Sequence, residues 1–466
     1  MKVNLSSKAH KRFSHIARWS GQIPFYLLVL YALKIRVLST RSLLSLLIAT
    51  AITLGFVGGS TPTDRQTRFQ TIGAIIAGRG FSLVGWEWQA LGEKATAWFN
   101  GTGAGLTIEQ ERALVYGYFD GVGEVRRLED RVNRLVSASS EATSGQNLTL
   151  AREQLAAARR QQQQRRPLVE AVIQRQVSEI LAEAGMGIAG APVPPVNFTF
   201  TEPPQILIIS PRQEIRNIYA QMLAPDIDSA EAGDKEAAIA ERTDFSAYIT
   251  RIGGLGAYPT MVVESTHIQW LFSTVAHEWV HNYLTLFPLG MRLGSSPEMT
   301  TLNETVADIV GDEVGLRVLR RFYPEFAPPE ETPAEAADVP PLSGGEPEQP
   351  PPFNFDREMR KTRLQVDDLL ADGQFEEAEA YMEVRRRFFV ENGYNLRVLN
   401  QAYFAFHGSY ATGGASSSPI GSQLQELQRR KTPEDIAGFL RTVRWFTSAT
   451  DLERVLGMTS EGFVKE

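Results

Sequence analysis

The sequence predicts an α+β protein with an amino-terminal transmembrane helix, and three observations lead to this prediction. Short runs rich in β-branched residues, such as 205–210, lie before an apolar, helix-like run at 271–287. Longer stretches with helical periodicity lie on both sides of this region. Residues 42–59 form a run of 18 residues without charge, which is close to the length that crosses a membrane as a helix.

The composition is that of a globular protein with more acidic than basic side chains. The chain of 466 residues can hold two or more folding units, and its hydrophobic content of 43% excludes a polytopic membrane protein. The net charge of −7 gives no basis for binding nucleic acid, so no nucleic-acid partner is expected. Because there is no cysteine, disulfides and thiol chemistry are excluded.

The amino-terminal charge pattern predicts a membrane anchor and its orientation. Residues 1–41 carry eight basic and no acidic residues, and they are predicted to be a cytoplasmic or interfacial segment. As a helix, residues 42–59 would span about 27 Å, against about 30 Å for the hydrocarbon core of a bilayer. The expected protein is therefore a single-pass protein of the cell membrane whose remaining residues lie outside the cytoplasm.

Two other interpretations of residues 42–59 stay open. The run could be the apolar part of a signal peptide that is cleaved near residues 57–59, which would release a secreted protein. It could also be a buried core helix. The uncleaved anchor is preferred, because the 41 residues before the run are long for a signal peptide and contain no acid.

Residues 60–190 are predicted to be a helical amino-terminal region. Residues 107–137 and 148–185 have helical periodicity and favour a helical hairpin, with a break or kink at Pro167. Three tryptophans after the anchor belong either to a membrane-surface helix or to an ordinary core. They are Trp86, Trp88 and Trp98.

Residues 191–323 are predicted to be a region of strands and helices that contains the apolar run. The run 205–210 is typical of a buried strand, and residues 211–223 are expected to form a helix that begins near a proline. Residues 258–264 are expected to form another strand, shortly before the apolar run.

The candidate metal site begins at His277-Glu278-Trp279-Val280-His281 within the apolar run. Two histidines four residues apart lie on the same helix face, so both imidazoles can bind one zinc ion. Glu278 lies beside that ion without being a ligand, and it could act as a general base towards a water molecule. A third protein ligand is expected, because a catalytic zinc usually has three and keeps one open position.

Glu304 is the candidate third ligand. It lies 23 positions after His281, in the run NETVAD at 303–308. On a helix, Glu304 and Asp308 face the same way. Asp308 could therefore accept the second ring N–H of a ligand histidine and fix the tautomer of that ring.

The motifs H-E-x-x-H and N-E-x-x-x-D in residues 271–313 resemble those of the gluzincin metallopeptidases, which include thermolysin-like proteases and zinc aminopeptidases. The resemblance implies a thermolysin-like catalytic domain, with residues 191–323 as its zinc-binding catalytic region, that hydrolyses a peptide or protein substrate. It also implies Glu278 as the general base and Asp308 as a partner of the ligands. The three implied ligands of Zn²⁺ are His277, His281 and Glu304.

The same resemblance implies further site elements. The strand at 258–264 would be an edge strand that pairs with the substrate backbone. A neutral donor from the carboxy-terminal part would stabilise negative charge on the carbonyl oxygen, and the candidates are His407 and Tyr410. The alternative for these two is a capping histidine and a packed tyrosine. Glu264 could bind a substrate amine, or it could be a surface carboxylate at the end of a strand.

The remaining residues are predicted to be a linker and a helical region. Residues 324–352 contain ten prolines and many acidic residues, which predicts a disordered linker. Residues 353–466 are predicted to form a helical carboxy-terminal part that completes the site, with a helical hairpin at 356–396.

Two rival functions stay open at this stage. One is an intramembrane metalloprotease, which would need the zinc helix within a membrane-spanning run. The other is a membrane-tethered binding or assembly protein with a vestigial protease site.

Overall fold

The computed structural model describes residues 64–99, 105–137, 142–188, 190–329, 353–430 and 435–457. The chain divides into two compact units, residues 1–67 and 68–466, and the fold described below is that of the second unit. Within the ranges just given, no helix combines the length and the apolar character needed to cross a membrane. The predicted anchor at 42–59 lies outside the described residues.

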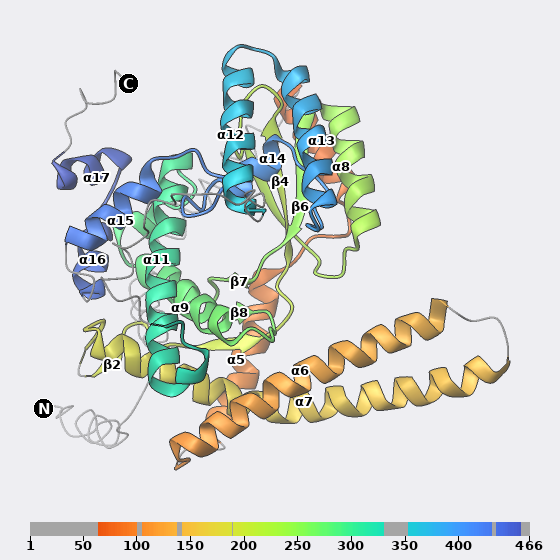
Figure 1. Ribbon diagram of the computed structural model, residues 1–466, viewed down its shortest axis with the longest axis vertical. Coiled ribbons are helices and arrows are strands. Elements are labelled where there is room, and N and C mark those ends of the chain that lie inside the picture. The colour runs from red at the N-terminus through yellow and green to blue at the C-terminus, as the bar shows by residue number, and fades with distance from the viewer. Residues whose placement is uncertain are drawn as a thin grey trace, which may run out of the picture. The chain divides into compact units, whose positions relative to one another are not determined.

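Two helices packed side by side, α9 (Ile268–Leu284) and α11 (Pro297–Phe322), form the centre of the largest hydrophobic core, which we call the first core (Figure 1). α11 begins after Ser296, whose side chain accepts a hydrogen bond from the Met299 backbone N–H. Apolar residues on the facing sides of both helices are fully buried and hold the pair together. They include Phe272, Val275, Val306, Val310 and Val314.

Glycines of α11 allow the two helices to come unusually close. A Cβ atom on Gly311 would lie 2.8 Å from the carbonyl oxygen of Ser273 and 2.9 Å from Cβ of His277. A Cβ atom on Gly315, one turn further along α11, would lie 2.8 Å from the backbone nitrogen of Ser273. Any larger residue at these positions would push the helices apart, because the contacts are with backbone atoms that cannot rotate away.

A three-stranded sheet lies against α9, with the strand order β3-β8-β7. β8 (Thr260–Val262) is parallel to β3 (Phe198–Phe200) and antiparallel to β7 (Gly254–Leu255). The expectation that residues 258–264 form an edge strand is therefore wrong, since β8 is paired on both sides. β3 and β7 are the two edge strands of this sheet. Gln174 and Glu170 of α7 bond the outer backbone groups of β3, so among the described residues the free edge is that of β7, in the glycine-rich turn before β8.

α6 (Ile108–Ser137) and α7 (Ala142–Glu183) lie alongside each other as a long helical pair (Figure 1). α7 is continuous through Pro167, so of the break or kink predicted there the break does not occur. Residues of both helices enter the first core, which joins the pair to α9 and α11. On the preceding helix, α5 (Leu83–Phe99), the Trp88 side chain is 73% exposed.

A second sheet is antiparallel throughout and has the strand order β5-β4-β6. Its strands are β4 (Gln205–Pro211), β5 (Tyr219–Leu223) and β6 (Phe245–Arg251). One face packs against α8 (Ser229–Thr243) and α4 (Asp64–Ile75), and their buried side chains form the second core. The predicted helix at 211–223 is wrong, because residues 212–218 form an irregular connection and β5 follows it, with its backbone satisfied by pairing with β4.

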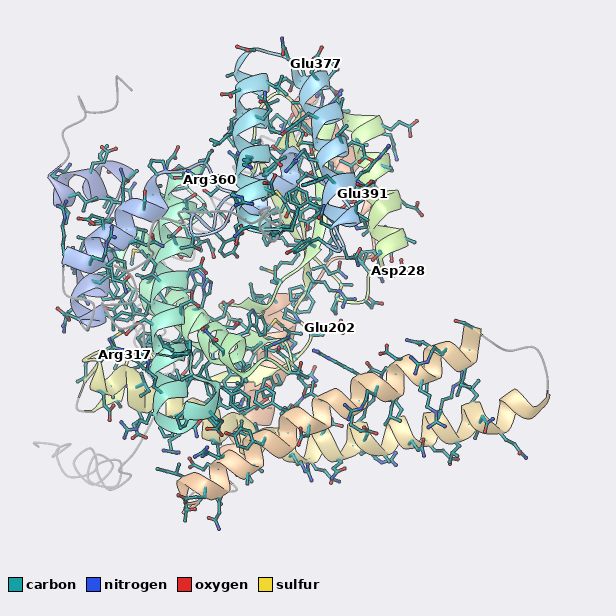
Figure 2. The ribbon with its side chains drawn as sticks, in the orientation of Figure 1. Glu202, Asp228, Arg317, Arg360, Glu377 and Glu391 are labelled. Carbon is teal, nitrogen blue, oxygen red and sulfur yellow. The ribbon has the colours of Figure 1, made fainter. Side chains whose placement is uncertain are left out.

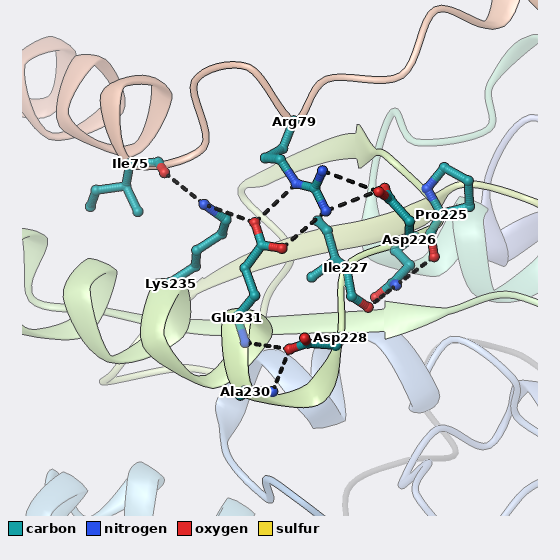
Figure 3. Close-up of polar contacts among 10 residues, drawn as sticks. Ile75, Arg79, Pro225, Asp226, Ile227, Asp228, Ala230, Glu231 and Lys235 are labelled. Carbon is teal, nitrogen blue, oxygen red and sulfur yellow. Dashed lines mark hydrogen bonds and ion pairs between the residues drawn. The ribbon is translucent and has the colours of Figure 1, made fainter. Parts of the chain in front are cut away.

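Polar contacts attach α4 and the segment after it to α8 and to the loop before α8 (Figure 3). The guanidinium group of Arg79 lies 3.2 Å from the carboxylate of Asp226 and 2.9 Å from that of Glu231. The ammonium group of Lys235 donates a hydrogen bond of 3.2 Å to the carbonyl oxygen of Ile75. The Asp228 side chain caps the start of α8, because it accepts hydrogen bonds from the first backbone N–H groups of that helix.

The carboxy-terminal helices divide between two hydrophobic cores. α12 (Phe355–Ala371), α13 (Phe375–Glu391) and α14 (Gln401–His407) form a third core, and Tyr248 of β6 packs against it. α15 (Ile420–Arg430), α16 (Ile436–Val443) and α17 (Ala449–Leu456) pack instead into the first core. The chain therefore crosses from one core to another between α14 and α15.

Short elements complete the described structure. They are β1 (Gly187–Ile188), β2 (Ala191–Pro192), α10 (Pro288–Met291) and the 3-10 helix η1 (Pro324–Phe326). η1 lies at the start of the predicted disordered linker, and its Glu325 pairs with Arg112 of α6 at 2.6 Å. The first residues of that predicted linker are thus part of the fold, and residues 330–352 lie outside the described residues.

The close approach of α9 and α11 leads to a stability prediction. Replacing Gly311 with alanine should lower the free energy of unfolding by about 1–3 kcal/mol, because the new methyl group meets backbone atoms. Gly233 of α8 is the matched control, since a Cβ atom there would meet nothing within 4 Å. Gly233→Ala should leave stability unchanged or raise it by up to about 1 kcal/mol. Urea denaturation of both variants tests this, and equal midpoints would contradict it.

Candidate metal centre

Three side chains from α9 and α11 converge at the helix contact. One potential ligand atom from each of His277, His281 and Glu304 lies within 4.8 Å of the others. The two Nε2 atoms are 3.0 Å apart, and Oε2 of Glu304 lies 3.6 Å from Nε2 of His277 and 3.5 Å from Nε2 of His281. Ligand atoms about 2.1 Å from one tetrahedral ion would lie about 3.4 Å apart. These three atoms form a triangle, which we call the ligand triangle or the triangle, and it has the dimensions that a single zinc ion requires.

Each histidine has a second polar partner that fixes its ring. Nδ1 of His277 lies 3.0 Å from Oδ1 of Asp308, and Nδ1 of His281 lies 2.7 Å from Oδ1 of Asn303. Because both partners are oxygen acceptors, Nδ1 carries the proton in each ring and Nε2 is left free to bind a metal.

Asn303 is the residue of this site to which sequence reasoning assigned no role. Its side-chain amide donates a hydrogen bond of 3.4 Å to the carbonyl oxygen of Leu289, which turns its oxygen towards His281. Its signal in the sequence is its place as the first residue of the N-E-x-x-x-D motif, directly before Glu304.

The charges of the buried cluster favour a positive charge at the two imidazoles. Burial opposes ionisation of Glu304, but His281 and His277 outweigh it and hold the pKa of this carboxyl well below its usual range. Burial would lower the pKa of His277, but its hydrogen bonds to Asp308 and Glu304 raise it above the ordinary value. Buried carboxylates thus favour either protons or a cation at the imidazoles, and a divalent ion can replace those protons.

Glu278 lies next to the triangle but is not part of it. The side chain is 6% exposed and contacts Gly254 of β7, where a Cβ atom would collide with the Glu278 carboxylate. Burial raises the pKa of this carboxyl, and the neighbouring histidines partly counteract that effect. Such a carboxylate is suited to take a proton and to return it later.

The structure separates the two candidates for the neutral donor. Tyr410 lies beside the triangle, with its ring centroid 6.4 Å from that of His277. Burial and the carboxylates of Glu304, Glu278 and Asp308 raise the pKa of Tyr410 well above its ordinary value, so its hydroxyl group keeps its proton.

His407 lies instead within an aromatic cluster. Its ring centroid is 4.3 Å from that of Tyr403 and 5.7 Å from that of Tyr248, and its Nε2 atom lies 3.3 Å from the Tyr248 hydroxyl. Burial lowers the pKa of His407 to about 4, so the ring is neutral. These contacts are those of a packed side chain.

Glu264, considered above as a possible ligand for a substrate amine, faces α6. Its carboxylate accepts a hydrogen bond from the hydroxyl of Tyr118, and its backbone oxygen accepts one of 2.9 Å from Arg126. This carboxylate therefore has a structural partner in the helical pair.

Comparisons of the chain with protein-family models, with curated proteins and with solved structures found no match. Any functional conclusion therefore depends on the geometry of the site itself.

The geometry of the triangle leads to a metal-binding prediction. The purified protein should hold about one zinc ion, and replacing His277, His281 or Glu304 with alanine should remove it. Asp308→Ala should weaken zinc binding by about 10–100-fold, because His277 would lose the partner that orients it. His267, which precedes α9, is the control, and His267→Ala should keep its zinc. Elemental analysis of each protein after loosely bound metal has been removed tests this. Full zinc content in all three ligand variants would contradict it.

Proposed function

We propose that the protein is a zinc-dependent peptidase that hydrolyses peptide bonds with a water molecule activated by Glu278. The observation that carries the proposal is the convergence of His277, His281 and Glu304 with a buried carboxylate directly beside them. The proposal also retains the single-pass anchor at 42–59 and an extracytoplasmic site, which the charge pattern of the sequence favours.

The side chains around the triangle would divide the reaction between them. Zinc, when bound, would polarise the substrate carbonyl group and lower the pKa of water next to it. Glu278 would remove a proton from the attacking water and pass it to the leaving amine. Tyr410 would donate its O–H to the carbonyl oxygen as negative charge develops there. Asp308 and Asn303 would hold the two imidazoles in the tautomer that this chemistry needs.

The free edge of β7 supports a peptide as the substrate. Val263 donates a backbone hydrogen bond of 3.0 Å to the carbonyl oxygen of Gly253, and Leu255 is paired with Met261. In an antiparallel pair the residue between two hydrogen-bonded positions points its N–H and C=O away, so those of Gly254 face the free edge. An extended peptide that pairs with Gly254 would pass directly beside Glu278.

The role of Glu278 is tested by its isosteric replacement. Glu278→Gln should keep zinc and fold while activity falls by about 10²–10⁴-fold, because the amide cannot take a proton. Glu202→Gln, a change of an exposed carboxylate labelled in Figure 2, should leave activity unchanged. Cleavage of a peptide library with and without chelator measures both variants. A wild-type protein that binds zinc but cleaves nothing would favour the binding or assembly protein instead.

The choice of Tyr410 over His407 leads to a separate prediction. Tyr410→Phe should keep zinc and lower kcat by about 10²–10³-fold, because the ring stays and only the donor to the carbonyl oxygen is lost. His407→Phe preserves an aromatic ring in its cluster and should stay near the parent kcat. Steady-state kinetics on one cleaved peptide distinguishes them, and the reverse order of effects would assign the donor to His407.

A further inference from the structure

We propose that Thr412 is a positioning residue of the metal centre, through which the loop that carries Tyr410 also orients the metal ligand His277. The loop is residues 408–419, which connect α14 to α15, and we call it the Tyr410 loop. The inference rests on the proposed function, and it adds a coupling between metal binding and the placement of the proposed donor.

The Tyr410 loop forms two hydrogen bonds with side chains of α11. The hydroxyl group of Thr412 donates a hydrogen bond of 3.1 Å to Oδ2 of Asp308. The other oxygen of the same carboxylate, Oδ1, lies 3.0 Å from Nδ1 of His277. The backbone N–H of Ala411 donates to Oγ1 of Thr305 at 3.2 Å, one residue after Glu304 on α11. The two residues that follow Tyr410 are therefore both attached to α11.

The opposite side of the loop is attached to α12. Arg360, which Figure 2 labels on this helix, donates a hydrogen bond of 2.8 Å to the carbonyl oxygen of Ser416. Arg363 donates one of 3.1 Å to the carbonyl oxygen of Ala415. Gly414 packs against the backbone of Asp356, where a Cβ atom would have no room. Because α12 belongs to the third core and α11 to the first, the loop connects two separately packed parts of the protein.

This arrangement explains how Thr412 would act at a distance from the metal. A carboxylate held by one hydrogen bond can rotate about its side-chain torsions, whereas Asp308 is held at both oxygens. Fixing Asp308 fixes the ring of His277, and outer partners of this kind raise metal affinity. The same hydrogen bond holds the loop at the position where Tyr410 faces the triangle. Loss of the Thr412 hydroxyl should therefore weaken metal binding and misplace Tyr410 together.

The experiment compares Thr412→Val, which removes the hydroxyl at nearly constant volume, with Thr412→Ser, which keeps it. Thr412→Val should bind zinc about 3–10-fold more weakly, a smaller loss than that expected for a direct partner of a ligand. At saturating zinc it should also show a lower kcat with an unchanged KM, because Tyr410 would be misplaced. Thr412→Ser should match the parent protein in both measurements. Zinc affinity is measured by competition with a chromophoric chelator, and kcat on a cleaved peptide.

Thr442→Val is the matched control, because the hydroxyl of Thr442 donates only to the Gly438 carbonyl within α16. Thermal unfolding checks that each variant is folded, and Thr412→Ala provides a second removal of the hydroxyl that adds no bulk. Parent zinc affinity and kcat in a folded Thr412→Val or Thr412→Ala variant would overturn the inference. A parent protein that binds no zinc would overturn the proposed function itself, which is a different result.

Discussion

The contact between α9 and α11 at Gly311 and Gly315 is the constraint on which the site depends. His277 and His281 come from one helix, whereas Glu304, Asp308 and Asn303 come from the other. These side chains are short, so their polar atoms can lie 2.7–3.6 Å apart only if the two backbones are nearly in contact. Glycine permits this approach, and the buried apolar residues along both helices supply the free energy that maintains it.

The site also draws on parts of the molecule outside that helix pair. β7 lies over α9 with its backbone next to Glu278, because glycine at 254 leaves no side chain between strand and carboxylate. The Tyr410 loop is held between α11 and α12 and places Tyr410 beside His277. In the proposed peptidase, each of the three functions thus comes from a different element: metal binding from the helix pair, substrate pairing from β7, and carbonyl stabilisation from the loop.

Sequence reasoning was most successful where local geometry alone determines the outcome. Residues four apart on a helix share a face. The spacing alone therefore predicts that His277 and His281 face the same way, and that Glu304 and Asp308 do. It failed where the outcome depends on a distant partner. Residues 219–223 form a strand because β4 is beside them, and β8 is central because β3, about sixty residues earlier in the chain, pairs with it.

The sequence by itself determined which side chains could hold a metal ion and which carboxylate lies beside them, because a helix places those side chains by its pitch. It carried no information on which strand keeps a free edge, or on whether His407 or Tyr410 faces the triangle. Those two residues are only three positions apart, yet one packs against Tyr403 and Tyr248 while the other lies beside His277. Tertiary structure decided this, because the direction of a loop is set by contacts with α11 and α12, which are far from it in the chain.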